Sequence, residues 1–539
     1  MTTPRRRDAR IRDRAAFLFC AAVLGMVVVY PVARLIGQAV AGWDMTAITE
    51  PVGVRAIRNT VVMSLLTVLF SGVFGTALAV WFSRYTFPGR DWAAALAYMP
   101  FTLPPLVGVL SFYYLIGRDG FVPRALERYL GFEDVYLEGP WAILAIHTYS
   151  FFVFFYAMVS ASLDSMDRSL VEAARSLGAT PLRAFFKVTL PLLRPALLGA
   201  ATLTFMSSGA SFSAPLIFGN QYPMLSVRIF EEREQHHDAA AVTLTVALAA
   251  VSLLALLLFR SRSRPVSGAS KGVRVPIRTA GARLIAALLS WGIALVLIVP
   301  HLTILLMSIV DHRSWHDEVF PVRYTFENYA GLVREPGMFA PIRNSFWMSA
   351  IAAAITLAVA APASYLIGRR RRGGSIINLI AMTPWALPGT VIAVSLIVAF
   401  NEAWMPLAGT IWLIPIAYVI RGIPLVTRMT TASVEVFDGT LMEAGRTLGG
   451  SPWYCFRRVA VPLLLPAIAA AMALSFATNL GEFVASILLW VPSNTPISVQ
   501  INMVWRGSGI GMAFAYSVLL MIFAVVTFVA SRRFASPLR

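Results

Sequence analysis

Long apolar segments recur along the whole chain, each separated from the next by a shorter polar stretch. A membrane-spanning helix needs roughly 20 mainly apolar residues. Twelve segments are apolar on this scale: 15–40, 59–83, 94–116, 141–162, 195–218, 239–259, 283–309, 344–367, 376–400, 411–432, 466–490 and 510–530. Of the 539 residues 58% are hydrophobic and only 13% are charged, whereas soluble domains have about 25% charged residues. We therefore predict an all-α integral membrane protein with twelve transmembrane helices.

The basic residues lie mainly in the stretches that join alternate apolar segments. If the N-terminus is cytoplasmic, most Lys and Arg fall on the cytoplasmic side, in clusters at 5–14, 168–194, 260–283, 428–458 and 532–539. An excess of Lys and Arg in cytoplasmic loops sets the orientation of membrane helices. We therefore expect both termini to be cytoplasmic. The same pattern accounts for the net charge of +18 without nucleic acid as a partner.

The first apolar segment follows a run of arginines, as the apolar part of a secretory signal peptide does. It covers about 15–40, which is too long for a signal peptide, so we expect it to be retained as a transmembrane helix. The two cysteines, Cys20 and Cys455, have no Cys or His neighbour at metal-ligand spacing. They predict neither a disulfide framework nor a metal site.

The two halves of the sequence repeat each other. Residues 57–60 read Ile-Arg-Asn-Thr, and residues 342–345 read Ile-Arg-Asn-Ser. The Met-Pro and Leu-Pro pairs within 99–104 recur as Thr-Pro and Leu-Pro within 383–388. Six predicted helices separate equivalent points, so the two copies are parallel repeats. The predicted parts are a first half at 1–260, a flexible cytoplasmic linker at 261–281 and a second half at 282–539.

The strongest match lies in two predicted cytoplasmic loops, at about 164–195 and 435–466. Each loop has a Glu-Ala-(Ala/Gly)-Arg-(Ser/Thr)-Leu-Gly run, followed by the same spacing of prolines. The matched positions, 271 residues apart, include Glu172, Ala173, Ala174, Gly178 and Pro191 in the first copy and Glu443, Ala444, Gly445, Gly449 and Pro462 in the second. A polar loop repeated at one constant offset indicates a shared role rather than chance.

Each loop is predicted to form a helix, a turn and a second helix that runs to Leu190-Pro191 or Val461-Pro462. Ser169 and Thr440 stand three residues before the Glu, the spacing of an N-cap in a capping box. Gly178 and Gly449 are placed to end the first helix, because glycine accepts a left-handed conformation there. Such an element, with small residues on one face, suits docking into a groove of a soluble partner. The alternative is a loop that only covers the end of the bundle.

The pattern Glu-Ala-Ala, three residues, Gly and a later Leu-Pro resembles the signature loop of permease subunits in binding-protein-dependent ABC importers. In that family the loop forms a coupling helix that sits in a cleft of the ATPase subunit. The resemblance therefore implies this role for both sets of loop residues given above. It also implies two copies of a cytoplasmic ABC ATPase, an extracytoplasmic solute-binding protein and a multi-pass location in the bacterial inner membrane.

Two halves in one polypeptide are most similar to the fused permeases of ferric-iron and thiamine importers. Arg421 and the Gly-Glu-Phe run at 481–483 also resemble that branch. The second copy departs from the family pattern at Gly445, where the first has Ala174. Glycine lowers helix propensity by roughly 1 kcal/mol relative to alanine, which questions whether the two docking sites are equivalent.

The chain itself has no motif for ATP hydrolysis. Its two lysines, Lys187 and Lys271, do not follow a Gly-rich phosphate-binding loop, so we expect ATP and Mg²⁺ to be held by a separate subunit. We find no catalytic set, predict no bound metal or cofactor, and do not expect an enzyme. The nearest candidate cluster, 236–238 (His-His-Asp), lies in an acidic external segment and is better explained as a solvated loop.

Two ionisable residues fall within predicted spans, where charge is costly. Glu482 and Arg421 are both expected in the middle of a helix. They could line the translocation path, or they could form a buried pair that holds helices together. In the first copy of the repeat, Ser211 stands at the position equivalent to Glu482, so the path would be asymmetric. The candidate path residues are Glu482, Arg421, Asn479, Ser207, Ser208 and Ser211.

The sequence therefore predicts a permease subunit that imports a solute by alternating access, driven by a partner ATPase. The alternative is a secondary transporter driven by an ion gradient, which would not need the docking loops. A membrane enzyme would need a convergent catalytic set. The family resemblance suggests ferric iron as the solute, with thiamine, polyamines and phosphonates as the other possibilities.

Overall fold

The computed structural model describes residues 4–167, 169–259, 275–277, 279–312, 315, 318–507 and 509–535. The chain divides into two compact units, which we name by their residues. Unit 1 consists of Met1–Trp43 and Thr325–Arg539, and unit 2 of Asp44–Tyr324. Most of the predicted linker, at 261–274 and 278, lies outside the described residues.

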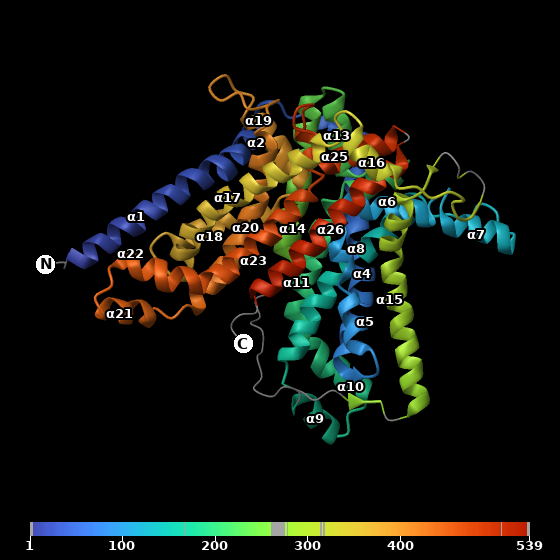
Figure 1. Ribbon diagram of the computed structural model, residues 1–539, viewed down its shortest axis with the longest axis horizontal. Helices are drawn as coiled ribbons and strands as arrows, with labels where there is room; N and C mark the ends of the chain where they lie inside the picture. Colours follow the sequence, from blue (N-terminus) through green and yellow to red (C-terminus); the bar gives the residue numbers. More distant parts are fainter. Residues whose placement is uncertain are drawn as a thin grey trace. The chain divides into compact units, whose positions relative to one another are not determined.

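All the regular elements in the described residues of unit 1 are helices (Figure 1). Its elements are α1 (Pro4–Leu24), η1 (Gly25–Val29), α2 (Tyr30–Ala41), α16 (Glu327–Arg334), α17 (Ala340–Gly368), α18 (Gly374–Met382), η5 (Thr383–Ala386), α19 (Gly389–Ala399), α20 (Leu413–Val436), α21 (Thr440–Thr447), α22 (Pro452–Cys455), η6 (Phe456–Ala460), α23 (Val461–Leu480), α24 (Ser486–Leu489), α25 (Ile497–Arg506) and α26 (Ile510–Ala535). Within this unit, α21 and α22 lie at one end and α25 at the other (Figure 1).

Unit 2 repeats in α3–α14 the order of helices α16–α26, with one additional helix, α7, between α6 and α8. Its elements are α3 (Met45–Thr49), α4 (Pro51–Arg84), β1 (Tyr85–Thr86), α5 (Arg90–Leu96), η2 (Met99–Thr102), α6 (Pro105–Ile116), α7 (Phe121–Leu130), α8 (Gly139–Ser165), α9 (Ser169–Ser176), α10 (Pro181–Ala184), η3 (Phe185–Thr189), α11 (Leu190–Gly209), α12 (Ser213–Phe218), α13 (Leu225–Glu234), α14 (Asp238–Leu258), β2 (Val275–Pro276) and α15 (Ala280–Ser308). Here too, α9 and α10 lie at the opposite end from α13 (Figure 1). The strands β1 and β2 form a short parallel pair.

The described part of the chain has ten helices that are long and apolar enough to cross a membrane. An eleventh candidate is the pair 374–386 and 389–399, which is bent by 111°. Its first-half counterpart, predicted at 94–116, is divided among α5, η2 and α6. Both breaks fall at a Leu-Pro step, where Leu103 and Leu387 are extended. Proline disfavours the helical conformation in the residue before it. A total of twelve spans stays a prediction.

Two predicted spans end earlier than expected. The segments 195–218 and 466–490 were predicted as single spans, but α11 ends at Gly209 and α23 ends at Leu480. The residues beyond these ends form the short helices α12 and α24. Apolar composition alone cannot show this break, because both the helix and the segment that follows it are apolar and partly buried.

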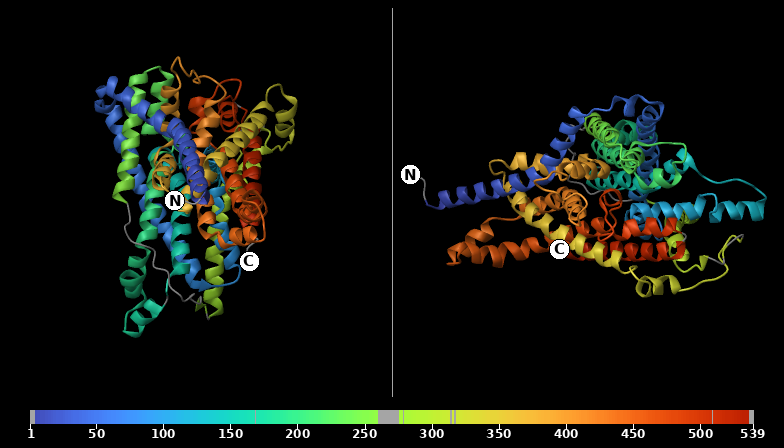
Figure 2. Two further views of the ribbon diagram at one scale, coloured as in Figure 1. Left: turned by 90° about the vertical axis from the view of Figure 1, so that its left-hand side faces the viewer. Right: turned by 90° about the horizontal axis from the view of Figure 1, so that it is seen from above.

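The first helix of each sequence half packs against helices of the other half of the sequence. Helices α1 and α2 contact α17, α18 and α19 within unit 1, and α15 contacts α5 and α6 within unit 2. Figure 2 shows α1 running beside the helices of unit 1. The compact units are therefore a different division of the chain from the sequence halves 1–260 and 282–539.

Small residues let the longest helices of each unit approach closely. A Cβ atom on Gly75 of α4 would lie 2.4 Å from the carbonyl oxygen of Phe152 in α8. In unit 1, a Cβ atom on Gly422 of α20 would lie 2.8 Å from the hydroxyl of Ser475 in α23. Helices in membranes associate largely through such close packing, because lipid supplies no hydrophobic driving force between them.

Candidate functional site

Two short helices, α9 and α21, occupy equivalent positions of the repeat and contain eight residues each. Ser169 and Thr440, which the sequence predicted as N-caps, are instead the first residues of these helices. The carboxylate of Asp167 accepts a hydrogen bond from the backbone N–H of Ser169 at 3.0 Å. The carboxylate of Asp438 accepts one from the backbone N–H of Thr440 at 2.9 Å. Bonds from the backbone and side chain of Thr440 lower the pKa of Asp438. Each helix therefore begins beside a carboxyl group, at the end where the helix dipole favours negative charge.

The predicted glycine ends of both helices are confirmed. Gly178 has φ +83° and Gly449 has φ +86°, in the left-handed region that favours glycine. The next N–H group in each copy bonds back to the helix, from Ala179 to the carbonyl of Ala174 and from Gly450 to that of Gly445, both at 3.0 Å. This bond closes the helix end and turns the chain into α10 or α22.

The sequence predicted that the second helix of each loop ends at Leu190-Pro191 or Val461-Pro462, and this prediction is wrong because both helices continue past these residues. Helix α10 continues through η3 into α11, and α22 continues through η6 into α23. Just before Pro191 and Pro462 the turn is π-helical, and the N–H of Leu190 reaches back five residues to the carbonyl of Phe185. Proline has no N–H and interrupts an α-helical ladder, which the wider turn accommodates. Each loop is therefore continuous with a membrane helix.

We call α9–α10 and α21–α22 the docking elements, after the role that the sequence predicts for them. In the second of them, Gly445 leaves room for Cys455, because a Cβ atom on Gly445 would lie 3.0 Å from Sγ of Cys455. The equivalent pair in the first element is Ala174 and Ala184. Ala184 and Cys455 are both buried. The loss of a methyl group at one position is thus matched by a larger side chain at the other.

The docking elements leave apolar side chains uncovered. The most exposed are Leu177 (89%), Leu448 (88%), Leu182 (72%) and Trp453 (69%). Leu177 is equivalent to Leu448 and Leu182 to Trp453, so the two surfaces correspond. Glu172 and Glu443 are also exposed. Clustered apolar side chains at an exposed surface mark sites of interaction.

Glu482 and Arg421 form an ion pair inside unit 1, with 2.7 Å between Nε and Oε2. Arg421 lies within α20 as predicted, but Glu482 follows the end of α23 and is not in the middle of a helix. The second carboxylate oxygen of Glu482 accepts a hydrogen bond from the N–H of Ala485 at 3.0 Å. The side chain of Glu482 is 8% exposed, whereas that of Arg421 is 38% exposed.

Two further polar residues, Tyr418 and Ser486, lie beside this pair, and the sequence did not predict them as site residues. The hydroxyls of Tyr418 and Ser486 are 2.9 Å apart, and Ser486 donates to the carbonyl of Glu482 at 2.8 Å. Tyr418 precedes Arg421 by three residues, about one helical turn, and this spacing could have predicted that the two side chains lie on one face of the helix. Asn479 is buried, and its amide nitrogen has no partner among the described residues.

The first half holds a cluster of hydroxyl and imidazole groups at the equivalent place. The hydroxyl of Ser208 lies 3.0 Å from Nδ1 of His147 and 3.1 Å from the hydroxyl of Thr67. His147 is the repeat equivalent of Tyr418, 271 residues earlier. Ser207 and Ser211 are half-buried. Of the candidate path residues of this half, the structure thus brings only Ser208 into a cluster, with His147 and Thr67, and no ion pair is found among the described residues around it.

The repeated Asn-Thr and Asn-Ser pairs hold a ten-residue helix in each unit. The hydroxyl of Thr60 accepts from the N–H of Leu225, the first residue of α13, at 2.9 Å. The hydroxyl of Ser345 accepts from the N–H of Ile497, the first residue of α25, at 2.8 Å. The preceding asparagine in each unit donates to a carbonyl just before the same helix. The repeat at 57–60 and 342–345 thus has a structural role.

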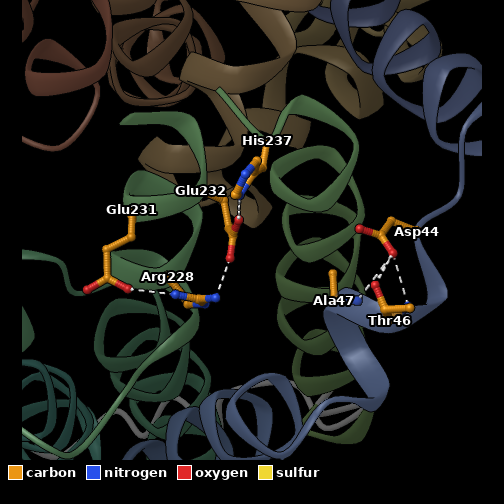
Figure 3. Close-up of polar contacts among 7 residues, drawn as sticks. All are labelled: Asp44, Thr46, Ala47, Arg228, Glu231, Glu232 and His237. Atoms are coloured by element: carbon orange, nitrogen blue, oxygen red, sulfur yellow. Dashed lines mark hydrogen bonds and ion pairs between the residues drawn. The ribbon is translucent and has the colours of Figure 1, made fainter. Parts of the chain in front are cut away.

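His237 and Asp238 contact charged side chains of α13. Nδ1 of His237 lies 2.9 Å from Oε2 of Glu232, whose other oxygen pairs with Arg228 (Figure 3). Asp238 pairs with Arg233. Within the described ranges no group of three or more His, Cys, Asp or Glu residues could hold a metal ion.

Comparisons with known proteins find two copies of one domain in the chain. A family described as "Binding-protein-dependent transport system inner membrane component" matches residues 71–264 and 357–539, more than half of the chain. Both matches begin after the first predicted span of a half, and each contains one docking element.

Individual relatives cover one half or most of the chain. A probable ABC transporter permease protein of Sinorhizobium fredii is 29% identical over 83% of this chain and 81% of its own length. The ferric transport system permease protein of Actinobacillus pleuropneumoniae is 28% identical over 88% of this chain and 70% of its own. A sulfate transport system permease protein of Salmonella typhimurium is 33% identical over 40% of this chain and 77% of its own.

Proposed function

The chain belongs to the family of binding-protein-dependent transport system inner membrane components, and we propose that it is the translocating subunit of an ATP-driven solute importer. It is a multi-pass inner membrane protein of the ABC permease type. ATP hydrolysis is assigned to a separate ABC ATPase subunit, present in two copies, which would hold ATP and Mg²⁺. An extracytoplasmic solute-binding protein would deliver the solute.

The pair of docking elements is the observation that carries this proposal. They lie at the same end of their respective units, with the same caps, the same turns and the same exposed apolar positions. A partner that binds one element therefore has a matching site on the other. A docking surface made of exposed leucine or tryptophan beside a carboxylate suits a groove in a soluble protein.

The continuity of each docking element with a membrane helix supports alternating access. Movement of a bound ATPase subunit would displace α9–α10 and, through the unbroken helix, α11 in the membrane. The same holds for α21–α22 and α23. Closure of two ATPase subunits on ATP binding would thus move both halves together and change which side of the membrane the solute site faces.

Ferric iron is the proposed solute. The support is the ferric transport relative, which matches the chain over most of its length. A sulfate transport relative matches over a shorter segment. Thiamine, polyamines and phosphonates would be alternative outcomes of a transport measurement.

Uptake into proteoliposomes tests the proposed function. The chain is reconstituted with its cognate ATPase and binding protein, and entry of radioactive ferric iron is followed with internal or external ATP. We expect uptake that needs ATP on the ATPase side and that persists when ionophores collapse ion gradients. Uptake that continues without the ATPase but stops with ionophores would assign the chain to the secondary transporters.

A further inference from the structure

The guanidinium of Arg421 is only partly used by its ion pair. Its Nε atom donates to Glu482, and no other bond joins it to a residue that the structure describes. Its side chain is 38% exposed, against 8% for Glu482. The two terminal nitrogens of the planar guanidinium are therefore held in a fixed direction and remain available as donors.

The position of Arg421 in α20 requires a polar environment. It lies eight residues after Leu413, about 12 Å along the helix axis from its start, well inside a span of 24 residues. A charged group at this depth is costly in lipid, and such groups face the bundle interior or a water-filled path. Because Glu482 fixes Nε, the side chain cannot extend freely to the membrane surface.

Arg428 lies seven residues further along the same helix. Two helical turns separate it from Arg421, so both side chains leave α20 on one face, with their Cα atoms about 10 Å apart. Arg428 is also exposed. Glu435, which is exposed too, follows after seven more residues near the end of α20. One face of α20 thus presents two cations in succession and then a carboxylate.

We propose that Arg421 and Arg428 form successive anion-binding positions on the transport path, and that the solute reaches them as an oxyanion or as a metal ion held by anionic oxygen ligands. This inference rests on the proposed function, because it assigns the helix face to that path. Arginine is suited to such groups, since its fork of N–H donors matches the paired oxygens of carboxylate, phosphate and sulfate.

The carboxylate of Glu482 supports an anion rather than a bare cation as the bound species. Both of its oxygens are engaged, one by Arg421 and one by the N–H of Ala485. It therefore orients the arginine and does not present a free ligand to a metal ion. The pair has no net charge, so we expect the anion to bind weakly enough to leave again, as a transport path requires.

Glu435 would assist departure of the anion. Its carboxylate stands one step beyond Arg428, near the end of α20 that leads to the docking element α21–α22. Like charges repel, so an anion that has reached Arg428 is favoured to leave the helix face there. The first half has Ser150 at the position equivalent to Arg421 and offers no such series on α8.

Equilibrium binding to the purified full chain in nanodiscs, without ATPase, binding protein or ATP, tests this proposal. The probes are radioactive sulfate, phosphate, citrate and ferric citrate, each measured by dialysis at low and high salt. We expect saturable binding of at least one probe that weakens as salt rises. Binding of sulfate or phosphate alone would indicate a free oxyanion, and binding of ferric citrate in preference to citrate would indicate a complexed metal.

Four variants locate the binding positions. Arg421→Gln should weaken binding about tenfold to a hundredfold, as expected for loss of a charge-assisted bidentate contact, and Arg421→Lys should restore only part of it. Arg428→Gln should also weaken binding. The control is Arg372→Gln, which removes the same charge from an exposed turn of unit 1 and should leave binding unchanged.

Folding is controlled by size-exclusion profile and thermal midpoint of each variant. If Arg421→Gln fails to fold, Arg421→Gln with Glu482→Gln replaces the ion pair by a neutral pair and carries the test. Wild-type affinity in the Arg421 and Arg428 variants, or the absence of saturable binding for every probe, would overturn the proposal. Because the assay needs no ATPase, that result would leave the outcome of the ATP-driven uptake experiment unaffected.

Discussion

At the scale of single residues, Gly445 shows how a departure from the repeat can be compensated. Sequence comparison of the two copies presents it as a weakening of the second docking helix, since glycine favours helix less than alanine does. The structure adds that Cys455 lies where a methyl group at 445 would point. Relative to Ala174 and Ala184 in the first element, Gly445 and Cys455 are therefore two substitutions that compensate each other in volume.

We expect Gly445→Ala alone to destabilise the second docking element, because its Cβ atom would lie 3.0 Å from Sγ of Cys455. Overpacking of this kind costs about 1–3 kcal/mol. The double variant Gly445→Ala with Cys455→Ala recreates the first element and should recover the loss. The measurement is ATPase co-purification together with the thermal midpoint. A double variant as poor as the single one would contradict the compensation.

The charge of Glu482 leads to a second residue-scale prediction. Glu482→Gln keeps an acceptor for the N–H of Ala485 but loses the charge that fixes Arg421. We expect solute uptake to fall while ATPase association stays normal, because the docking elements are unchanged. Uptake and co-purification are measured on the same preparation. Wild-type uptake by this variant would remove the pair from the transport path.

Local chemistry was predicted from sequence where one residue type decides it. Gly178 and Gly449 were assigned as helix ends because a left-handed position selects glycine, and their φ angles confirm this. The capping residues were missed because Asp167 and Ser169 are both good N-caps. Only the backbone geometry shows that the helix starts at the serine.

At the scale of elements, the repeated Asn-Thr and Asn-Ser pairs pin α13 and α25 to the long helices. Asn344 is buried and donates to the carbonyls of Ser493 and Thr495 at 3.4 Å and 3.2 Å. Asn59 donates to the carbonyl of Pro223 at 3.0 Å. The sequence revealed that these residues repeat, but their partners are about 150 residues away and have no local signature.

We expect Asn344→Ala to lower stability by roughly 1–3 kcal/mol, because it leaves buried carbonyl groups without a donor. The matched control is Asn401→Ala at an exposed position. Thermal unfolding in detergent or nanodiscs gives the comparison. Equal midpoints for the two variants would show that the pin contributes little to holding α25.

The exposed leucines of the docking elements yield an element-scale prediction about the partner. Leu177→Glu and Leu448→Glu each place a charge on an apolar contact surface without touching the interior, since both side chains are almost fully exposed. We expect each to weaken ATPase association and both together to abolish it. Leu130→Glu, at an exposed leucine on α7, is the control and should bind normally.

Element boundaries in the membrane were predicted less well than element positions. Apolar composition located the helices, but it merged α11 with α12 and α23 with α24. It also placed Glu482 in the middle of a helix, although α23 ends two residues before it. A membrane-embedded turn is as apolar as the helix it follows, so hydropathy does not mark the break.

At the scale of the whole molecule, the sequence repeat and the compact units describe the chain differently. The repeat predicts two equivalent halves, and the family match confirms two copies of one domain. The compact units nonetheless combine α1 and α2 with residues 325–539, and α15 with residues 44–324. Which neighbour a first span joins depends on tertiary packing, which the apolar composition of the span does not reveal.

The composition of the purified complex is the most direct test of the central claim that this chain is a permease with two ATPase docking sites. The chain is isolated from its native membrane in mild detergent, and the mass of the intact complex is determined by native mass spectrometry. We predict one chain with two ATPase subunits, and a chain without ATPase when Leu177→Glu and Leu448→Glu are combined. Isolation of the wild-type chain without an ATPase, with full uptake activity in the double variant, would contradict the account.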